Sequence, residues 1–123
     1  MAESVMLDRA KDFAVEIVNL CRSVQAEKKE YVMTGQLLRC GTSIGANIHE
    51  SKYAQSKADF VSKMQIALKE CYETEYWLEL LVRTGFLPAE RYDALQTSCG
   101  TLRRMLISSI NTAKRKITSS SMS

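Results

Sequence analysis

The sequence predicts an all-α fold, an antiparallel up-down four-helix bundle, and three observations support this. Apolar residues recur at three- and four-residue spacing in four separate segments, as in helices that bury one stripe. The connections between these segments are short, so consecutive helices are expected to lie antiparallel. The chain contains only one proline and five glycines, and no segment has the pattern of a strand.

The first helix is expected over residues 3–26 and the second over residues 34–52. The charged segment 27–30 forms the turn between them, and Thr34 is a candidate N-cap of the second helix. The apolar stripe of the first helix consists of Ala10, Phe13, Ala14, Ile17, Leu20, Cys21 and Val24. The core face of the second helix consists of Leu37, Gly41, Ile44 and Ile48.

The third helix is expected to open with a capping box at residues 56–59 and to end near Thr84 and Gly85. Pro88 suits the first turn of the fourth helix. The third stripe consists of Phe60, Met64, Ala67, Cys71, Thr74, Leu78 and Leu81, and the fourth of Leu95, Cys99, Leu102, Leu106, Ser109, Ala113 and Ile117. We expect the bundle to comprise residues 1–118, with a disordered, serine-rich tail at residues 119–123.

Length and composition are those of one soluble domain. The chain has 123 residues, of which 46% are hydrophobic and 25% charged. No apolar run approaches the ~20 residues that span a bilayer, and the N-terminus lacks the features of a signal peptide. We therefore expect a cytoplasmic protein without a membrane partner.

The four cysteines are interpreted as buried, reduced thiols. One falls in each expected helix, and none forms a C-x-x-C pair. An up-down bundle places Cys21 and Cys40 at one level and Cys71 and Cys99 at another, roughly 8 Å away at the rise of a helix. That separation is too large for one tetrahedral zinc site, so no metal or other cofactor is expected.

No catalytic constellation is recognisable in the chain. His49 is the only histidine, and there are no Glu-x-x-His pairs of the kind that hold metals in helix bundles. The sequence also lacks a nucleophile elbow and a glycine-rich phosphate loop. We therefore expect the protein not to be an enzyme.

The segment 40–48 carries no charge although it lies within an amphipathic helix, whose outer face is normally charged. The outer side of this helix is expected to present Thr42, Gly45, Ala46 and His49. We predict that these four residues form a subunit interface. The spacing of Gly41 and Gly45 would also permit close helix packing, either within one chain or between subunits.

A polar cluster is expected at the boundary of the same core face. Ser43, Asn47 and Glu50 share one flank of the second helix and would need partners if half-buried. We predict an interhelical hydrogen-bond network with Glu73 of the third helix. A binding site is the alternative.

The distribution of charge gives the best indication of function. The net charge is only +3, but no acidic residue follows Asp93. The basic residues beyond it are Arg103, Arg104, Lys114, Arg115 and Lys116, and the outer face of the third helix is expected to add Lys69, Tyr72, Tyr76 and Arg83. Basic side chains with nearby tyrosines suit phosphate contacts and base stacking, so we predict a nucleic-acid-binding surface. The alternative is a solvated face combined with a subunit interface.

Two blocks of sequence resemble the signature of the 23S rRNA intervening-sequence proteins, also called S23-type four-helix-bundle proteins. The first block consists of residues 37–39 and 42–50, the latter reading TSIGANIHE, and the second of residues 59–78. Residues 85–87 are similar to the step that ends the family's third helix. The resemblance extends roughly over residues 13–113 and implies a ring-shaped homo-oligomer, a pentamer. It supplies no catalytic role.

Related proteins of this architecture are accessory subunits of diversity-generating retroelements, where they associate with a reverse transcriptase and its RNA. The combined expectation is a bacterial, non-enzymatic, ring-forming protein that binds nucleic acid, RNA in particular, with a reverse transcriptase as a candidate partner. The alternative is a structural adaptor ring that binds a protein partner and has no nucleic-acid role.

Overall fold

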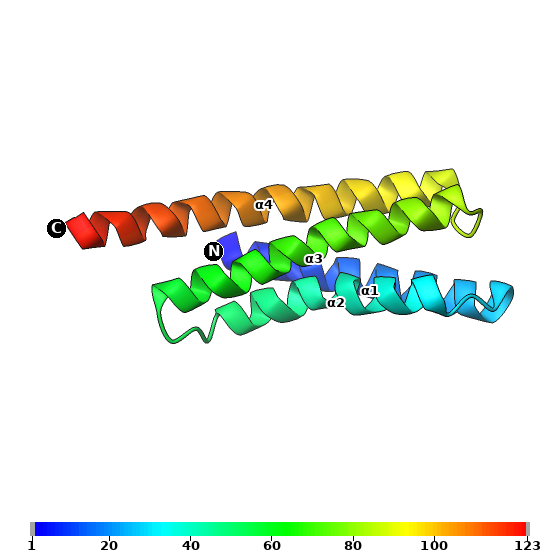
Figure 1. The fold of residues 1–123 in the computed structure, drawn as a ribbon, viewed down its shortest axis with the longest axis horizontal. Coiled ribbons are helices and arrows are strands. Elements are labelled where there is room, and N and C mark those ends of the chain that lie inside the picture. The colour runs from blue at the N-terminus through cyan, green and yellow to red at the C-terminus, as the bar shows by residue number, and fades with distance from the viewer. Residues whose placement is uncertain (1, 123) are drawn as a thin grey trace.

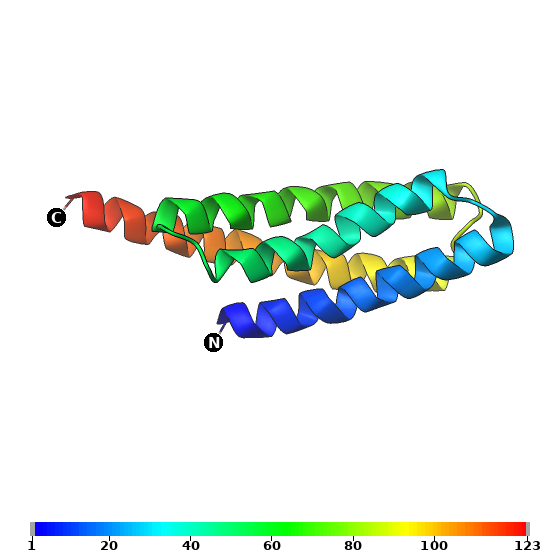
Figure 2. The same ribbon diagram turned by 90° about the horizontal axis from the view of Figure 1, so that it is seen from below.

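The computed structural model describes the backbone of residues 2–122 and the side chains of residues 3–119. Helices α1 (Ala2–Lys28), α2 (Val32–Ser51), α3 (Lys57–Arg83) and α4 (Ala89–Met122) follow one another along the chain. Consecutive helices lie side by side and reverse direction at each connection (Figures 1 and 2). The prediction of four helices without strands is therefore confirmed for residues 2–122.

The start of α2 differs from the expectation. The carboxylate of Glu30 accepts hydrogen bonds from the backbone N–H groups of Met33 and Thr34, at 2.6 and 3.2 Å. These are amides of the first turn, which lack partners within the helix. Thr34 is not the N-cap but a buried residue within α2, and its hydroxyl donates to the Glu30 carbonyl at 2.8 Å. The prediction was wrong because an acidic side chain in the preceding turn already fills the capping role.

The boundaries of α3 and α4 follow the local sequence signals. The Ser56 hydroxyl accepts a hydrogen bond from the backbone N–H of Asp59 at 3.0 Å, which confirms the N-terminal cap of α3. Gly85 has a φ of +84°, a conformation that favours glycine, and it lies directly beyond the end of α3. Helix α4 begins at Ala89, immediately after Pro88.

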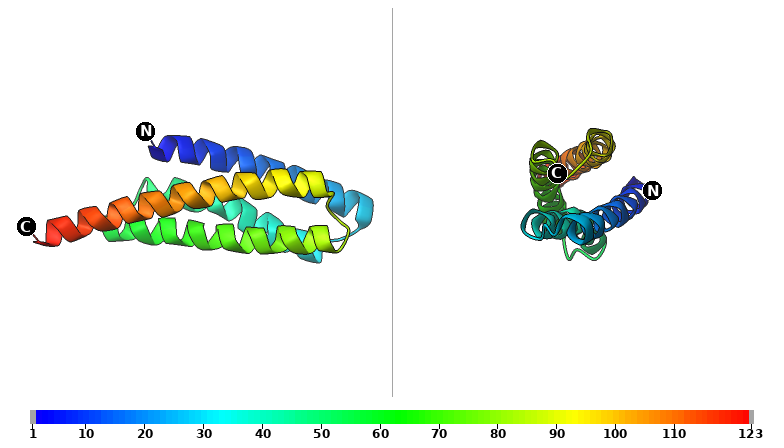
Figure 3. Two further views of the ribbon diagram at one scale, coloured as in Figure 1. Left: turned by 90° about the horizontal axis from the view of Figure 1, so that it is seen from above. Right: turned by 90° about the vertical axis from the view of Figure 1, so that its right-hand side faces the viewer.

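Helix α4 is the longest helix, and its C-terminal end extends past the rest of the bundle (Figure 1). It continues through residues 119–122, beyond the boundary at residue 118 that the sequence suggests, while residue 123 lies outside the described part of the chain. At the same end of the molecule, α1 and α4 diverge toward the N-terminus of α1 (Figure 3).

All four helices contribute to one core. Its fully buried large side chains are Met6, Phe13, Ile17, Leu20, Leu37, Ile44, Ile48, Met64, Leu78, Leu81, Leu102 and Leu106. The buried hydroxyls of Ser51 and Thr74 donate to carbonyls of their own helices, at 2.6 and 2.7 Å, so their burial leaves no unpaired donor.

The four cysteines are free and buried, as predicted. Burial raises the pKa of the Cys21 thiol to about 12 and that of Cys40 to about 11. On the other side of the bundle, the Cys99 thiol donates to the Cys71 carbonyl at 3.6 Å. Within the described residues, no three histidine, cysteine or acidic side chains gather in a way that could hold a metal ion.

The two central glycines of α2 face α1 of the same chain. A Cβ atom added to Gly41 would lie 2.9 Å from Cγ2 of Ile17, and one added to Gly45 would lie 3.4 Å from Cβ of Ala10. Gly45 is buried and does not belong to an outer face, so its assignment to a subunit interface was wrong. The small residues of this stretch instead let α1 approach α2 closely.

None of the helices within residues 2–122 has the length and apolar character needed to cross a membrane.

Candidate nucleic-acid interface

Four exposed basic side chains of α4, from residue 104 onward, define what we call the α4 basic face: Arg104, Lys114, Arg115 and Lys116. Within the part of the chain that the structure describes, none of the four forms an ion pair with a carboxylate. Arg104 donates to the Thr101 hydroxyl at 3.5 Å and Arg115 to the Thr112 hydroxyl at 3.3 Å. Their charges are therefore available to an anionic partner.

Three of these residues lie at the end of the bundle where α1 and α3 begin. Glu3 and Lys57, at the starts of α1 and α3, line one groove together with Thr112 and Lys116 of α4. The segment 114–116 is consequently at the end of the bundle, at the base of the projecting part of α4 (Figure 2). Positive charge at a protruding helix end is accessible from several directions.

Arg103 and Arg83 differ from the α4 basic face because both are paired. Nε of Arg103 lies 3.1 Å from Oε2 of Glu75, and both side chains are largely buried between α3 and α4. The hydrogen bond with this carboxylate raises the pKa of Arg103. Arg83 pairs with Glu79 of its own helix at 3.3 Å, in a well-exposed pair. Arg103 thus also links two helices, a role that its sequence position does not reveal.

The predicted tyrosines lie on the outer side of α3. Tyr72 is 51% exposed and Tyr76 is 57% exposed, and Lys69 is exposed on the same helix. Tyr72 lies one helical turn before Glu75, the partner of Arg103, and Tyr76 makes an edge contact with Trp77 at 5.0 Å between ring centroids. Exposed aromatic rings near cationic groups are the arrangement on which unpaired bases stack.

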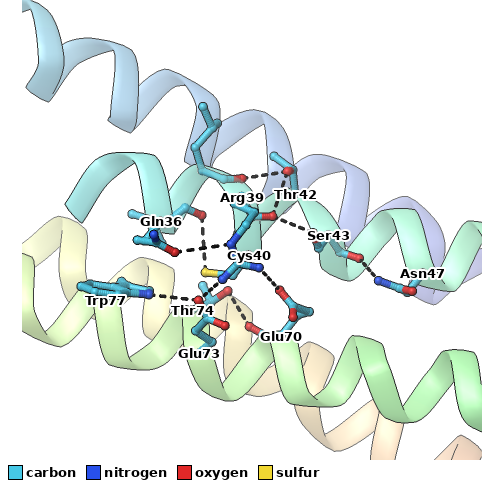
Figure 4. A network of polar contacts seen from close by, with 12 residues as sticks. Gln36, Arg39, Cys40, Thr42, Ser43, Asn47, Glu70, Glu73, Thr74 and Trp77 are labelled. Atoms are coloured by element: carbon cyan, nitrogen blue, oxygen red, sulfur yellow. Dashed lines mark hydrogen bonds and ion pairs between the residues drawn. The ribbon is translucent and has the colours of Figure 1, made fainter. Parts of the chain in front are cut away.

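The main polar cluster between α2 and α3 centres on Arg39 (Figure 4). Its guanidinium pairs with Glu70 at 3.2 Å and also with the carboxylate of Glu73. Glu73 in turn accepts a hydrogen bond from Nε1 of Trp77 at 3.2 Å. The hydrogen bond from Arg39 lowers the pKa of Glu73, so this carboxylate stays charged in the folded protein.

The predicted polar network is only partly present. Glu73 and Glu50 do join α2 to α3, but in separate ion pairs, since Glu50 contacts Lys63 at 3.1 Å. Ser43 donates to the Arg39 carbonyl at 2.7 Å, and Asn47 donates to the Ser43 carbonyl at 2.9 Å. These two side chains bond to their own helix and connect to Glu73 only through Arg39 (Figure 4), while Glu50 lies outside this network.

Sequence reasoning missed Arg39, Glu70 and Trp77 as members of the cluster. A signal was available, because four glutamates lie within residues 70–79 of the third helix and Arg39 directly precedes the uncharged segment of the second. In an antiparallel pair, a lone cation facing two carboxylates would be expected to bridge them.

Replacement of Arg39 by methionine is expected to destabilise the protein by about 1 kcal/mol near neutral pH, since its guanidinium is half exposed. Because the pKa of Glu73 is lowered in the folded state, the stabilisation is complete above the ordinary value of 4.5 and is lost as the pH falls below it. The difference between wild type and Arg39→Met should therefore shrink in acid. Urea unfolding across this pH range measures it.

Arg83→Met is the matched control, because it removes an exposed pair within one helix. We expect it to cost less than about 0.5 kcal/mol at any pH. An Arg39→Met effect that persists undiminished in acid would show that packing of the arginine stem, rather than the ion pairs, stabilises the α2–α3 contact.

The remaining predicted interface residues lie on an outer stripe of α2. Ala46 and His49 are exposed, and His49 makes an edge contact with the exposed ring of Tyr53 at 5.6 Å between centroids. Thr42 is half-buried, and its hydroxyl donates to the Leu38 carbonyl at 2.7 Å. We call Thr42, Ala46, His49 and Tyr53 the α2 outer stripe. This stripe contains no aspartate, glutamate, lysine or arginine.

Comparison with known proteins agrees with this architecture. A solved structure, described as a protein with unknown function from the S23 ribosomal protein family from Bacteroides thetaiotaomicron VPI-5482, is similar to the chain with a TM-score of 0.89 and 50% sequence identity. The similarity covers 90% of this chain and 99% of that one. No curated protein matches the chain. The model of the 23S rRNA-intervening sequence protein family matches residues 2–108, and the chain therefore belongs to that family.

Proposed function

We propose that the protein is a non-enzymatic homo-oligomer that binds RNA through the α4 basic face and the adjoining outer side of α3. The observation that carries this proposal is the α4 basic face itself: exposed cations on a helix segment that has no acidic residue after Asp93. Phosphate contacts from such side chains provide most of the affinity for nucleic acids.

Self-association supports the proposal because a net charge of +3 on one subunit is modest. The α2 outer stripe is a surface on which two copies could pack without burying charge. The pentamer that the resemblance implies would place five α4 basic faces on one ring. Weak contacts on several subunits would then act together on one RNA molecule.

The biological setting that we propose is an RNA shared with a second protein. The family's description refers to a 23S rRNA intervening sequence, and related rings accompany the reverse transcriptase of diversity-generating retroelements. In either setting the protein would contribute RNA binding and no chemistry.

Light scattering coupled to size exclusion, with and without a structured RNA, tests the proposal. We expect an oligomer that gains mass with RNA at about 50 mM salt and loses it at about 200 mM, because bound cations release counterions that salt restores. A monomer in both conditions would contradict the oligomer. An oligomer that never binds RNA would contradict the RNA-binding role.

The adaptor alternative is favoured by a different observation. Tyr31 and Val32, at the connection between α1 and α2, are 58% and 79% exposed. Exposed apolar side chains at one end of the bundle would suit a protein partner. Three results together would establish this function instead. The oligomer would not bind RNA, it would bind a protein partner whose binding does not depend on salt, and Val32→Asp would abolish that binding.

A further inference from the structure

Gly100 is a helical glycine that no core contact requires. The Cβ atoms of alanines at the positions of Gly41 and Gly45 would meet atoms of α1, but an added Cβ at Gly100 would meet no atom of another helix within 4 Å. The nearby atoms are Nη1 of Arg104 at 3.4 Å and Nη2 of Arg103 at 3.5 Å. A glycine inside a helix is about 1 kcal/mol less favourable than alanine, so its presence here has another reason.

The two guanidinium groups converge above Gly100. Long side chains on a helix point back toward its N-terminus, over the residues three and four positions earlier. For Arg103 and Arg104 that position is Gly100 in both cases, and both guanidinium groups lie over it. Their terminal nitrogens are consequently near the same point of the surface.

The pair keeps one uncompensated positive charge. Arg103 uses its Nε to bind Glu75, which fixes the guanidinium and leaves its Nη groups directed toward Gly100. Arg104 has no carboxylate partner among the described residues, and it contacts the Thr101 hydroxyl. Two guanidinium groups that converge on one point of the surface offer several N–H donors, which a phosphate group can accept.

The surroundings indicate on which side an anion would bind. The groove between α4 and α1, about 280 Å³ in volume, is lined by two acidic residues, Asp12 and Glu16, against one basic residue, Arg9, and is less favourable for a phosphate. The side toward α3 instead presents the exposed ring of Tyr72, which lies one helical turn before Glu75, the partner of Arg103. A base could stack on this ring while its phosphate occupies the arginine pair.

We infer that Arg103, Arg104 and the gap above Gly100 form a phosphate-binding fork for single-stranded RNA, with Tyr72 as the adjacent stacking surface. This inference rests on the proposed function and specifies one of its contact sites. It predicts that the relative position of the two guanidinium groups matters as well as their charge.

Gly100→Leu tests the geometry without changing any charge. A Cβ atom alone would make only ordinary contacts with the two guanidinium groups, so the larger side chain is needed to displace them. Leucine is a good helix former, and the fold is expected to be retained. Arg104→Lys keeps the charge but removes the planar fork. With a fluorescein-labelled oligouridylate of about 12 nucleotides as the probe, each variant should weaken binding about three- to tenfold in fluorescence anisotropy.

Arg91→Gln is the matched control, because it removes a whole exposed charge from the same helix. It should change the affinity by less than about twofold. If wild type binds but Gly100→Leu and Arg104→Lys bind as tightly as wild type, the fork is overturned while the proposed function stands. If wild type binds neither the oligouridylate nor the structured RNA, the fork and the proposed function are both overturned.

Discussion

Reversal of charge at two positions of the α4 basic face, Arg104→Glu with Arg115→Glu, is expected to weaken RNA binding by about 100-fold or more. Both guanidinium groups are exposed and unpaired with carboxylates in the described structure, so each is free to contact phosphate. Glutamates there would replace attraction by repulsion. Because two phosphate contacts are lost, the dependence of log affinity on log salt should become shallower by about 2.

The control for this prediction is the same change of net charge placed elsewhere. Arg22→Glu with Arg91→Glu alters two exposed arginines outside the α4 basic face. If both double variants lose affinity equally, total charge rather than location governs binding. If Arg104→Glu with Arg115→Glu binds like wild type at low salt while its mass by light scattering is unchanged, the α4 basic face is not the binding surface.

Gly41→Leu is expected to lower the free energy of unfolding by about 3 kcal/mol, the upper part of the range for overpacked cores. Even a Cβ atom at this position would lie 2.9 Å from Cγ2 of Ile17 and 3.4 Å from its Cβ. Since the Cβ of Ile17 is fixed to the backbone of α1, the two helices would have to separate. Urea unfolding followed by circular dichroism measures the change.

Alanine at three glycines of α2 provides a graded control. Gly35 has open space around it, so Gly35→Ala should stabilise the protein by about 0.5–1 kcal/mol through helix propensity alone. Gly45→Ala makes an ordinary contact with Ala10 and should be nearly neutral, whereas Gly41→Ala should destabilise. Equal effects at all three positions would show that α1 does not pack closely on α2.

The close packing of α1 on α2 also changes the expectation for Gly45→Leu. If Gly45 lay on the outer face of α2, as the sequence suggested, this variant would dissociate the oligomer and leave its helices intact. Because Gly45 lies against Ala10, the larger side chain should instead separate α1 from α2 and unfold the subunit.

The fold could be predicted because its determinants are local. Helical periodicity locates the four stripes, and Ser56, Gly85 and Pro88 mark helix ends through the conformations they favour. Thr34 was misassigned because a hydroxyl and a nearby carboxylate, Glu30, compete for the same amides, and only the path of the turn decides between them.

The site was less predictable because it depends on which helix covers which flank. A helical projection gives the direction of Gly45 but not the tilt of α1 that buries it. Likewise Arg103 and Arg104 are neighbours of the same type, yet one is tied to Glu75 across the α3–α4 contact and the other is not. The hydroxyl of Ser43 and the amide of Asn47 had partners within their own helix, so their polarity did not require a network.

The reversal of direction at each short connection has a consequence for how the chain folds. Helices that are neighbours in sequence are also the ones that pack together most extensively, whereas α1 and α4, at the two ends of the chain, meet only sparsely. Few long loops must therefore close before favourable contacts form, and chains of such low contact order fold on the microsecond to millisecond timescale. The chain can therefore acquire its structure one helical hairpin at a time.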